Sequence, residues 1–199
     1  MNTMNLDSHT LTAVAILAAL AVLALATWMM QRRNQSERLQ HRFGTEYERT
    51  VERLGSREKA EAELRARELR VQRMHIEALA PSDAARFTQD WKLLQSRFVD
   101  NPSGTLADAD RLVRELMLRR GYPMADFERR AADISVDHPT VVEHYRAAHD
   151  IALRDQRDQT DTEDLRRAVL HYHALFDDLL EVAPVLPRNT STRHMEARS

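Results

Sequence analysis

The pattern of hydrophobic and polar positions first separates one apolar run from the rest of the chain. Residues 11–30 read LTAVAILAALAVLALATWMM, with no charged residue and only two threonines as polar interruptions. Twenty helical residues at about 1.5 Å each span roughly 30 Å, which is the thickness of a bilayer hydrocarbon core. We therefore predict a transmembrane helix at residues 11–30, preceded by a short extracytoplasmic N-terminus at residues 1–10.

A charged stem follows at residues 31–79, and its pattern is helical. Gly44 and Gly55 are expected to bend it, because glycine weakens a helix by about 1 kcal/mol relative to alanine. A narrow apolar stripe recurs at helical spacing and fades after Gly55, at Leu39, Phe43, Tyr47, Val51 and Leu54. The stripe does not sustain a heptad for three repeats. Two interpretations stay open, namely a coiled-coil homodimer through the stem and a solvated spacer helix.

From residue 80 the pattern changes to short amphipathic helices, and no segment alternates with the period of a strand. The predicted core faces follow spacings of three and four. They comprise Ala84, Phe87, Trp91, Leu94 and Phe98; Ala109, Leu112, Val113 and Leu116; Met124, Phe127, Ala131 and Ile134; Val141, Tyr145, Ala148 and Ala152; and Leu165, Val169, Tyr172, Phe176 and Leu179. We predict an all-α domain of about five short helices over residues 80–182, followed by a disordered tail at residues 183–199.

Local signals place the helix ends. Ser82 and the pair Thr105 and Asp108 are typical of N-terminal caps, and residues 160–163 (TDTE) resemble a capping box. Pro139 is a favoured first helical residue, with His138 as a cap before it. Gly121, before Tyr122 and Pro123, is predicted to end a helix in the left-handed conformation.

Flanking charge predicts the orientation of the apolar helix. Trp28 lies near one end, where an indole ring prefers the membrane interface, and Arg32 and Arg33 follow directly. The segment before the run contains no Lys or Arg, so the positive-inside rule places everything after Met30 in the cytoplasm. A cleaved signal peptide is the alternative, with residues 24–26 (ALA) as the cleavage motif, although the basic n-region of a signal peptide is missing.

The balance of charge differs along the chain and limits the partners. Residues 31–79 hold 12 Lys/Arg against 9 Asp/Glu, whereas residues 80–183 hold 14 against 20. A basic stem is attracted to an anionic lipid surface. An acidic domain binds nucleic acid poorly, because its negative charge is repelled by the phosphates. We therefore expect a lipid bilayer as partner and no nucleic acid. The absence of cysteine excludes disulfides, thiolate metal sites and cysteine nucleophiles.

Histidine is the residue type that most suggests chemistry, yet its spacing is unfavourable for a metal. His138, His144 and His149 are six and five residues apart, and rings five residues apart on a helix diverge by about 140°. His171 and His173 flank Tyr172 on opposite sides. A site between helices, built from His149 with His171 or His173 and an acid such as Asp177, remains an alternative to ordinary partly buried histidines.

No catalytic constellation is visible. There is no G-x-S-x-G motif, and four glycines cannot build a phosphate-binding loop. Acidic residues at Asp161, Glu163 and Asp164 complement the dipole at a helix start, and nothing in the sequence around the pair Asp177–Asp178 favours a general acid. The aromatic residues fit interior packing better than a ligand cage. We predict no enzyme activity, no cofactor and no metal.

Five blocks of the sequence resemble a family of uncharacterised bacterial proteins with an N-terminal membrane segment, usually labelled hypothetical, membrane or secreted. These blocks are YERTVERLGSREKAEAELRARELRV, DWKLLQSRFVDNPSG, ADRLVRELMLRRGYP, AADISVDHPTVVEHYRAAH and TEDLRRAVLHYHALFDDLL. The resemblance covers about residues 37–181 and implies a bacterial cell-envelope setting. It implies no activity, ligand or catalytic residue.

Together these features predict a single-pass protein of the bacterial inner membrane. Its cytoplasmic helical domain would act as a scaffold or adaptor that binds a protein partner. Two alternatives remain: a histidine-based module that senses a metal or ligand, and an exported periplasmic envelope protein.

Overall fold

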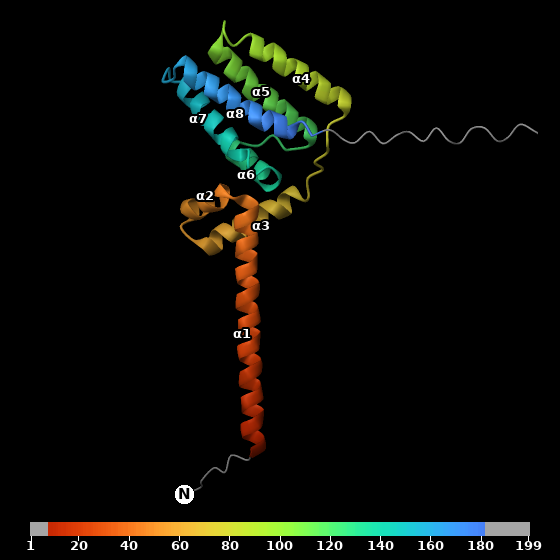
Figure 1. Cartoon of the computed structure of the whole chain (residues 1–199), viewed down its shortest axis with the longest axis vertical. Coiled ribbons are helices and arrows are strands. Elements are labelled where there is room, and N and C mark those ends of the chain that lie inside the picture. Colours follow the sequence, from red (N-terminus) through yellow and green to blue (C-terminus); the bar gives the residue numbers. More distant parts are fainter. Residues whose placement is uncertain (1–7, 182–199) are drawn as a thin grey trace, which may run out of the picture. The chain divides into compact units, whose positions relative to one another are not determined.

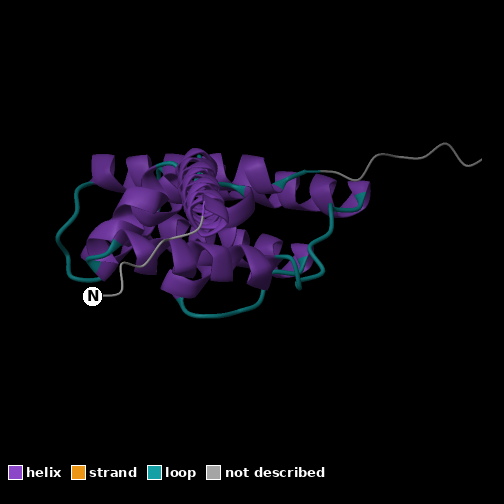
Figure 2. Cartoon of the chain, turned by 90° about the horizontal axis from the view of Figure 1, so that it is seen from below, coloured by secondary structure: helices purple, strands orange, loops and turns teal. Residues whose placement is uncertain are grey.

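The computed structural model describes residues 8–181 of the 199-residue chain, with side chains from residue 13 onward. Figure 2 shows that this part of the chain is built from helices and loops, without a strand. It divides into an N-terminal unit, Met1–Glu68, and a C-terminal unit, Leu69–Ser199. The all-α prediction is confirmed. The tail predicted at residues 183–199, and most of the N-terminus predicted at residues 1–10, lie outside the described residues.

The N-terminal unit begins with α1, Ser8–Phe43, a single helix of 36 residues (Figure 1). Its apolar part is long enough and hydrophobic enough to cross a membrane. The side chains of this part are not covered by the protein; Leu20 is 57% exposed and Val22 is 67% exposed. The helix ends at Gly44, whose φ of 51° is readily adopted by glycine.

Two shorter helices complete the N-terminal unit, α2 at Thr45–Leu54 and α3 at Arg57–Val71, whose last residues belong to the C-terminal unit. Gly55, with a φ of 64°, caps α2, so both predicted bends are confirmed. Leu39, Phe43 and Tyr47 of the predicted stripe are buried. The stem is therefore not a solvated spacer helix. Its stripe is already covered by the chain itself, and dimerisation through the stem stays a prediction.

Charged and polar side chains are buried alongside this apolar stripe. Arg67 of α3 is 3% exposed, and its Nη1 lies 3.4 Å from Oε2 of Glu46 on α2. A second guanidinium nitrogen of Arg67 donates to the Thr50 hydroxyl at 3.4 Å. Glu61 accepts from the hydroxyls of Tyr47, at 3.1 Å, and of Ser36 on α1. These contacts join all three helices.

The C-terminal unit contains α4 (Pro81–Ser96), α5 (Pro102–Arg120), α6 (Phe127–Asp137), α7 (Val142–Asp155) and α8 (Thr162–Leu179). In the described part of the unit, these are the five short helices that the sequence predicts. α8 packs against both α5 and α7, α4 packs against α5, and α6 contacts α7. The apolar face of α8 is therefore covered by two neighbours.

The predicted core faces meet in one continuous core. Trp91 stacks on Phe176 with ring centroids 4.7 Å apart, and Tyr145 meets Tyr172 edge-on at 6.2 Å. Most of the predicted aromatic and aliphatic positions are buried, with Phe98, Phe127, Val141 and Ala152 partly buried at the edge. Met124 is an exception, because it lies outside any helix and is 49% exposed.

Several predicted helix starts are wrong. α5 begins at Pro102, three residues before Thr105, because the Asn101 side chain accepts a hydrogen bond from the Gly104 N–H at 3.0 Å. The residue before α4 is Ala80, and no side chain caps this helix, so Ser82 is not the cap. The cap of α8 is Asp161, which accepts from the Asp164 N–H at 2.7 Å, within the predicted TDTE segment.

The start of α7 also differs from its prediction. Residues 139–141 form a turn, and α7 begins at Val142 rather than at Pro139. His138 is instead the C-terminal cap residue of α6, where its N–H donates to the Ile134 carbonyl at 2.8 Å. Gly121 ends α5 with a φ of 100°, as its sequence context predicts.

Candidate functional site

The residues predicted to flank a membrane lie in one continuous stretch of α1. Trp28 is 54% exposed, and the guanidinium carbon of Arg32 lies 5.2 Å from the centre of its ring. Arg33 is exposed and its Nε lies 3.7 Å from Oε1 of Glu37. The Trp28 ring lies at the end of the apolar segment and Arg32 lies over its face. Tryptophan and arginine are the residue types found where an apolar segment meets a membrane–water interface.

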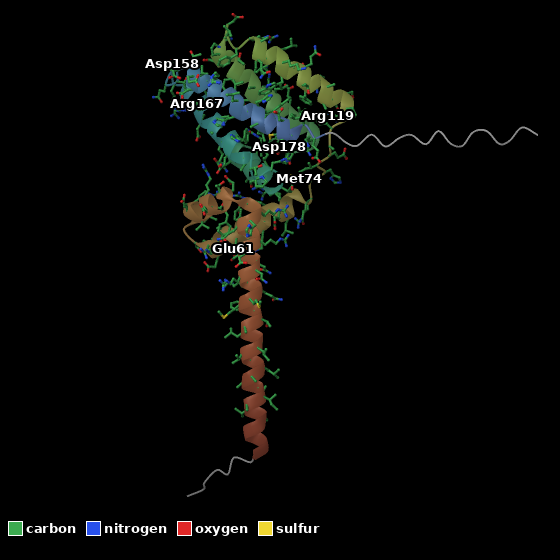
Figure 3. The ribbon with its side chains drawn as sticks, viewed as in Figure 1. Glu61, Met74, Arg119, Asp158, Arg167 and Asp178 are labelled. Carbon is green, nitrogen blue, oxygen red and sulfur yellow. The ribbon has the colours of Figure 1, made fainter. Side chains whose placement is uncertain are left out.

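A line of polar contacts joins α7 and the preceding turn to α8, and we call it the α7–α8 seam. It comprises the pairs His138–Asp178, His144–His171 and Arg154–Asp164, the last with Nη1 and Oδ2 3.7 Å apart. Figure 3 labels Arg167 and Asp178, which mark the course of α8 along this seam. The seam exists because the two helices run antiparallel beside a shared aromatic core.

His144 and His171 form the closest histidine pair of the seam. Their Nδ1 atoms are 2.8 Å apart, and the ring planes are inclined by 31° with centroids 5.1 Å apart. Burial, together with the charges of His144 and Arg167, lowers the pKa of His171. The His171 ring is therefore held toward its neutral form, in which one nitrogen carries a free lone pair.

The interhelical site predicted from His149, His171 or His173 and Asp177 is not assembled. His149 stacks on Phe127, with ring centroids 3.6 Å apart, and burial lowers its pKa. His173 lies beside Trp91 at 4.9 Å and pairs with Asp177 of its own helix at 3.2 Å. The structure brings His171 to His144 instead.

Sequence reasoning missed the His144–His171 pair because it matched the histidines of the last helix with His149 rather than with His144. A usable signal was present, since each histidine directly precedes a core tyrosine, Tyr145 or Tyr172. Two helices that pack their tyrosines together bring the preceding residues to the same edge of the interface. Aligning the two helices on these core tyrosines would have paired His144 with His171.

The acidic residues considered as catalytic groups are engaged in structural contacts. Asp161 caps α8, and Glu163 accepts two hydrogen bonds from Arg166 that lower its pKa. Asp164 pairs with Arg167, and Asp178 pairs with His138. A general acid at neutral pH requires a raised pKa, and Glu163 shows the opposite shift.

The buried tyrosines are likewise held by polar neighbours. The Tyr172 hydroxyl donates to Asp110 of α5 at 3.0 Å, and Arg130 donates to the Tyr145 hydroxyl at the same distance. Burial raises the pKa of both phenols, and also that of Tyr122. The neutral phenols of Tyr145 and Tyr172 therefore link helices through hydrogen bonds.

Comparison of the chain with protein families, curated proteins and solved structures found no match. The chemistry of the molecule must therefore be argued from its own residues. Within the described residues, no group of three or more His, Asp or Glu side chains is arranged to hold a metal ion. Two features are therefore candidates for a function: the exposed apolar part of α1, which ends at Trp28 and Arg32, and the α7–α8 seam.

Proposed function

We propose that the protein is a single-pass scaffold or adaptor of the bacterial inner membrane, anchored by α1 and carrying a cytoplasmic helical domain. The observation that carries this proposal is the apolar part of α1. Its large side chains are more than half exposed, from Val14 at 63% to Met30 at 68%. Burial is worth about 25 cal/mol for each Å² of apolar surface, so this surface strongly favours a lipid phase.

The boundary at Trp28 and Arg32 supports the orientation. Arginines follow the apolar segment and none precedes it, so the side with the helical domain is the cytoplasmic side by the positive-inside rule. A reporter fused after residue 199 tests this orientation. A cytoplasm-dependent reporter should be active and a periplasm-dependent one inactive; the reverse result would establish the exported alternative.

The adaptor role rests on the C-terminal unit. The titratable side chains described above form helix caps, ion pairs and hydrogen bonds between helices. Leucines on three of its helices, in contrast, are exposed. Leu93 of α4, Leu118 of α5 and Leu170 of α8 are 49%, 56% and 50% exposed. We propose these three exposed leucines as the positions at which a protein partner makes contact.

Site-specific photo-crosslinking in intact membranes tests the adaptor role. A photoreactive residue at position 93, 118 or 170 should give one discrete adduct, whereas the same residue at the exposed polar position Gln95 should give none. An aspartate substitution at a neighbouring anchor should abolish the adduct. If no position yields an adduct, and the purified protein turns over a substrate, the adaptor proposal is wrong.

A further inference from the structure

His144 and His171 direct the same type of ring nitrogen at one point from two different helices. Both rings are half-buried, and their Nδ1 atoms are 2.8 Å apart. Two imidazoles at that distance share one proton when nothing else is bound, with one ring donating an N–H and the other accepting. Once that proton is displaced and the two rings turn, the same two nitrogens could ligate a single ion.

Alanines flank the pair along both helices. One turn after His144 come Ala147 and Ala148, and three residues to either side of His171 stand Ala168 and Ala174. Residues three and four apart on a helix are neighbours, so Val141 before His144 and Leu175 after His171 also lie next to the rings.

One charged group faces the pair along α8. Arg167 lies one turn before His171, where it contributes to lowering the pKa of that histidine, and it also pairs with Asp164. A neutral imidazole is the form that ligates metal, so burial, the largest cause of the lowered pKa, favours binding at neutral pH, whereas the positive charge of Arg167 opposes it.

We propose that His144 and His171 form a two-histidine site for an exchangeable divalent transition-metal ion, Cu²⁺, Ni²⁺ or Zn²⁺, ligated through Nδ1 of each ring. Nitrogen–metal bonds of about 2.0–2.1 Å place two ligand nitrogens on one ion roughly 3 Å apart, close to their present separation. Each ring would have to turn, because the two Nδ1 atoms now point at each other. Water would complete the coordination. Imidazole suits these ions and not Mg²⁺ or Ca²⁺.

The consequence of binding is a clamp between α7 and α8. The ion would replace a shared proton by two coordinate bonds across the seam, and the rest of the C-terminal unit packs on these two helices. With two protein ligands the site is weaker than a closed structural zinc site, which has four. This inference does not depend on the adaptor role.

Copper electron paramagnetic resonance on the tag-free full-length protein in detergent micelles tests the ligand set directly. At pH 7.5 with one equivalent of Cu²⁺, we expect hyperfine structure from two imidazole nitrogens. His144→Gln and His171→Gln should each remove one nitrogen from the spectrum. The matched control is His75→Gln, because His75 is exposed in the same unit and should leave the spectrum unchanged.

Thermal unfolding gives a second and independent reading. Saturating Zn²⁺ or Ni²⁺ should raise the midpoint of the wild-type protein and of His75→Gln by about 5 °C, since a ligand that binds only the folded state stabilises it. The shift should disappear in His144→Gln and His171→Gln, whose folding is checked by circular dichroism. An equal shift in all four proteins, or no shift and no two-nitrogen spectrum in the wild type, would overturn the proposal.

Discussion

At the scale of single residues, Arg67 is one of three buried charged residues in the described part of the N-terminal unit, with Glu46 and Glu61. The guanidinium is 3% exposed and contacts Glu46, Glu63 and Thr50. Such a pair costs desolvation energy to form, so its net contribution to stability is small. Removing one partner lowers stability strongly, because the remaining charge stays buried without its counter-ion.

Arg67→Met is therefore expected to lower the free energy of opening of α2 by about 3 kcal/mol. Hydrogen exchange of the α2 amides in micelles measures this quantity. Arg65→Met is the control, since Arg65 lies on the same helix with its side chain exposed, and it should change the value by less than about 0.5 kcal/mol. Equal effects of the two substitutions would contradict the structural role of Arg67.

Gly121 is the second residue on which a large effect is expected. Its φ is 100°, and a Cβ placed on it would lie 2.2 Å from the His75 carbonyl oxygen. Gly121→Ala combines backbone strain with a clash against main chain, so it should destabilise the C-terminal unit by at least about 2 kcal/mol.

Urea unfolding followed by Trp91 fluorescence, in a Trp28→Phe background, measures the effect of Gly121→Ala. Leu118→Ala is the matched control on the same helix, because Leu118 is 56% exposed and its truncation leaves no cavity. A Gly121→Ala protein as stable as this control would show that the turn relaxes without cost.

At the scale of helices, periodicity predicted the five elements of the C-terminal unit and most of their buried faces. Boundaries were less predictable, since several residues compete for each cap. Asn101 caps α5 because its carboxamide reaches the Gly104 N–H, so Thr105 lies inside the helix. The Arg67–Glu46 contact was unpredictable for another reason: residues so far apart in sequence meet only after the turn at Gly55 folds α3 back on α2.

The histidines between helices make the stability of the C-terminal unit depend on pH. Burial lowers the pKa of His149 and His171 below the ordinary value of about 6.5, and for His149 it outweighs the charges of Asp110 and Asp150. The unfolded chain then binds more protons than the folded one, so stability rises with pH. This contribution is present above about pH 6.5 and is lost as the pH falls through the lower folded pKa.

His149→Phe should reduce the loss of stability between pH 7 and pH 5, because phenylalanine can stack on Phe127 without binding a proton. Urea midpoints recorded at both pH values measure the difference. His75→Gln serves as the reference, as its exposed ring should leave the pH dependence unchanged. An unchanged slope in His149→Phe would mean that this ring does not contribute.

At the scale of the whole molecule, a long apolar helix is joined to two compact units that bury their own cores. Length and composition identified the apolar helix from sequence, because twenty consecutive uncharged residues are typical of a membrane-spanning helix. The compactness of the N-terminal unit was not predictable from a stripe that equally fits a dimer.

Membrane anchoring predicts a position-dependent cost of charge. Leu20→Arg places a guanidinium at the middle of the apolar run and should cost about 2.5–3.5 kcal/mol of insertion, whereas Met30→Arg at its end lets the side chain reach the interface. Carbonate extraction should release more of the Leu20→Arg protein than of the wild type or Met30→Arg. Equal retention of all three proteins in the membrane fraction would contradict a span at residues 11–30.

The continuity of α1 has a mechanical consequence. The helix runs without interruption from its apolar part to Phe43, about 54 Å at 1.5 Å per residue, and its last turns supply Leu39 and Phe43 to the core of the N-terminal unit. A tilt or rotation of the apolar part therefore turns those two side chains as well. If α1 spans a bilayer as proposed, a change in bilayer thickness that tilts the helix would alter the packing around Phe43.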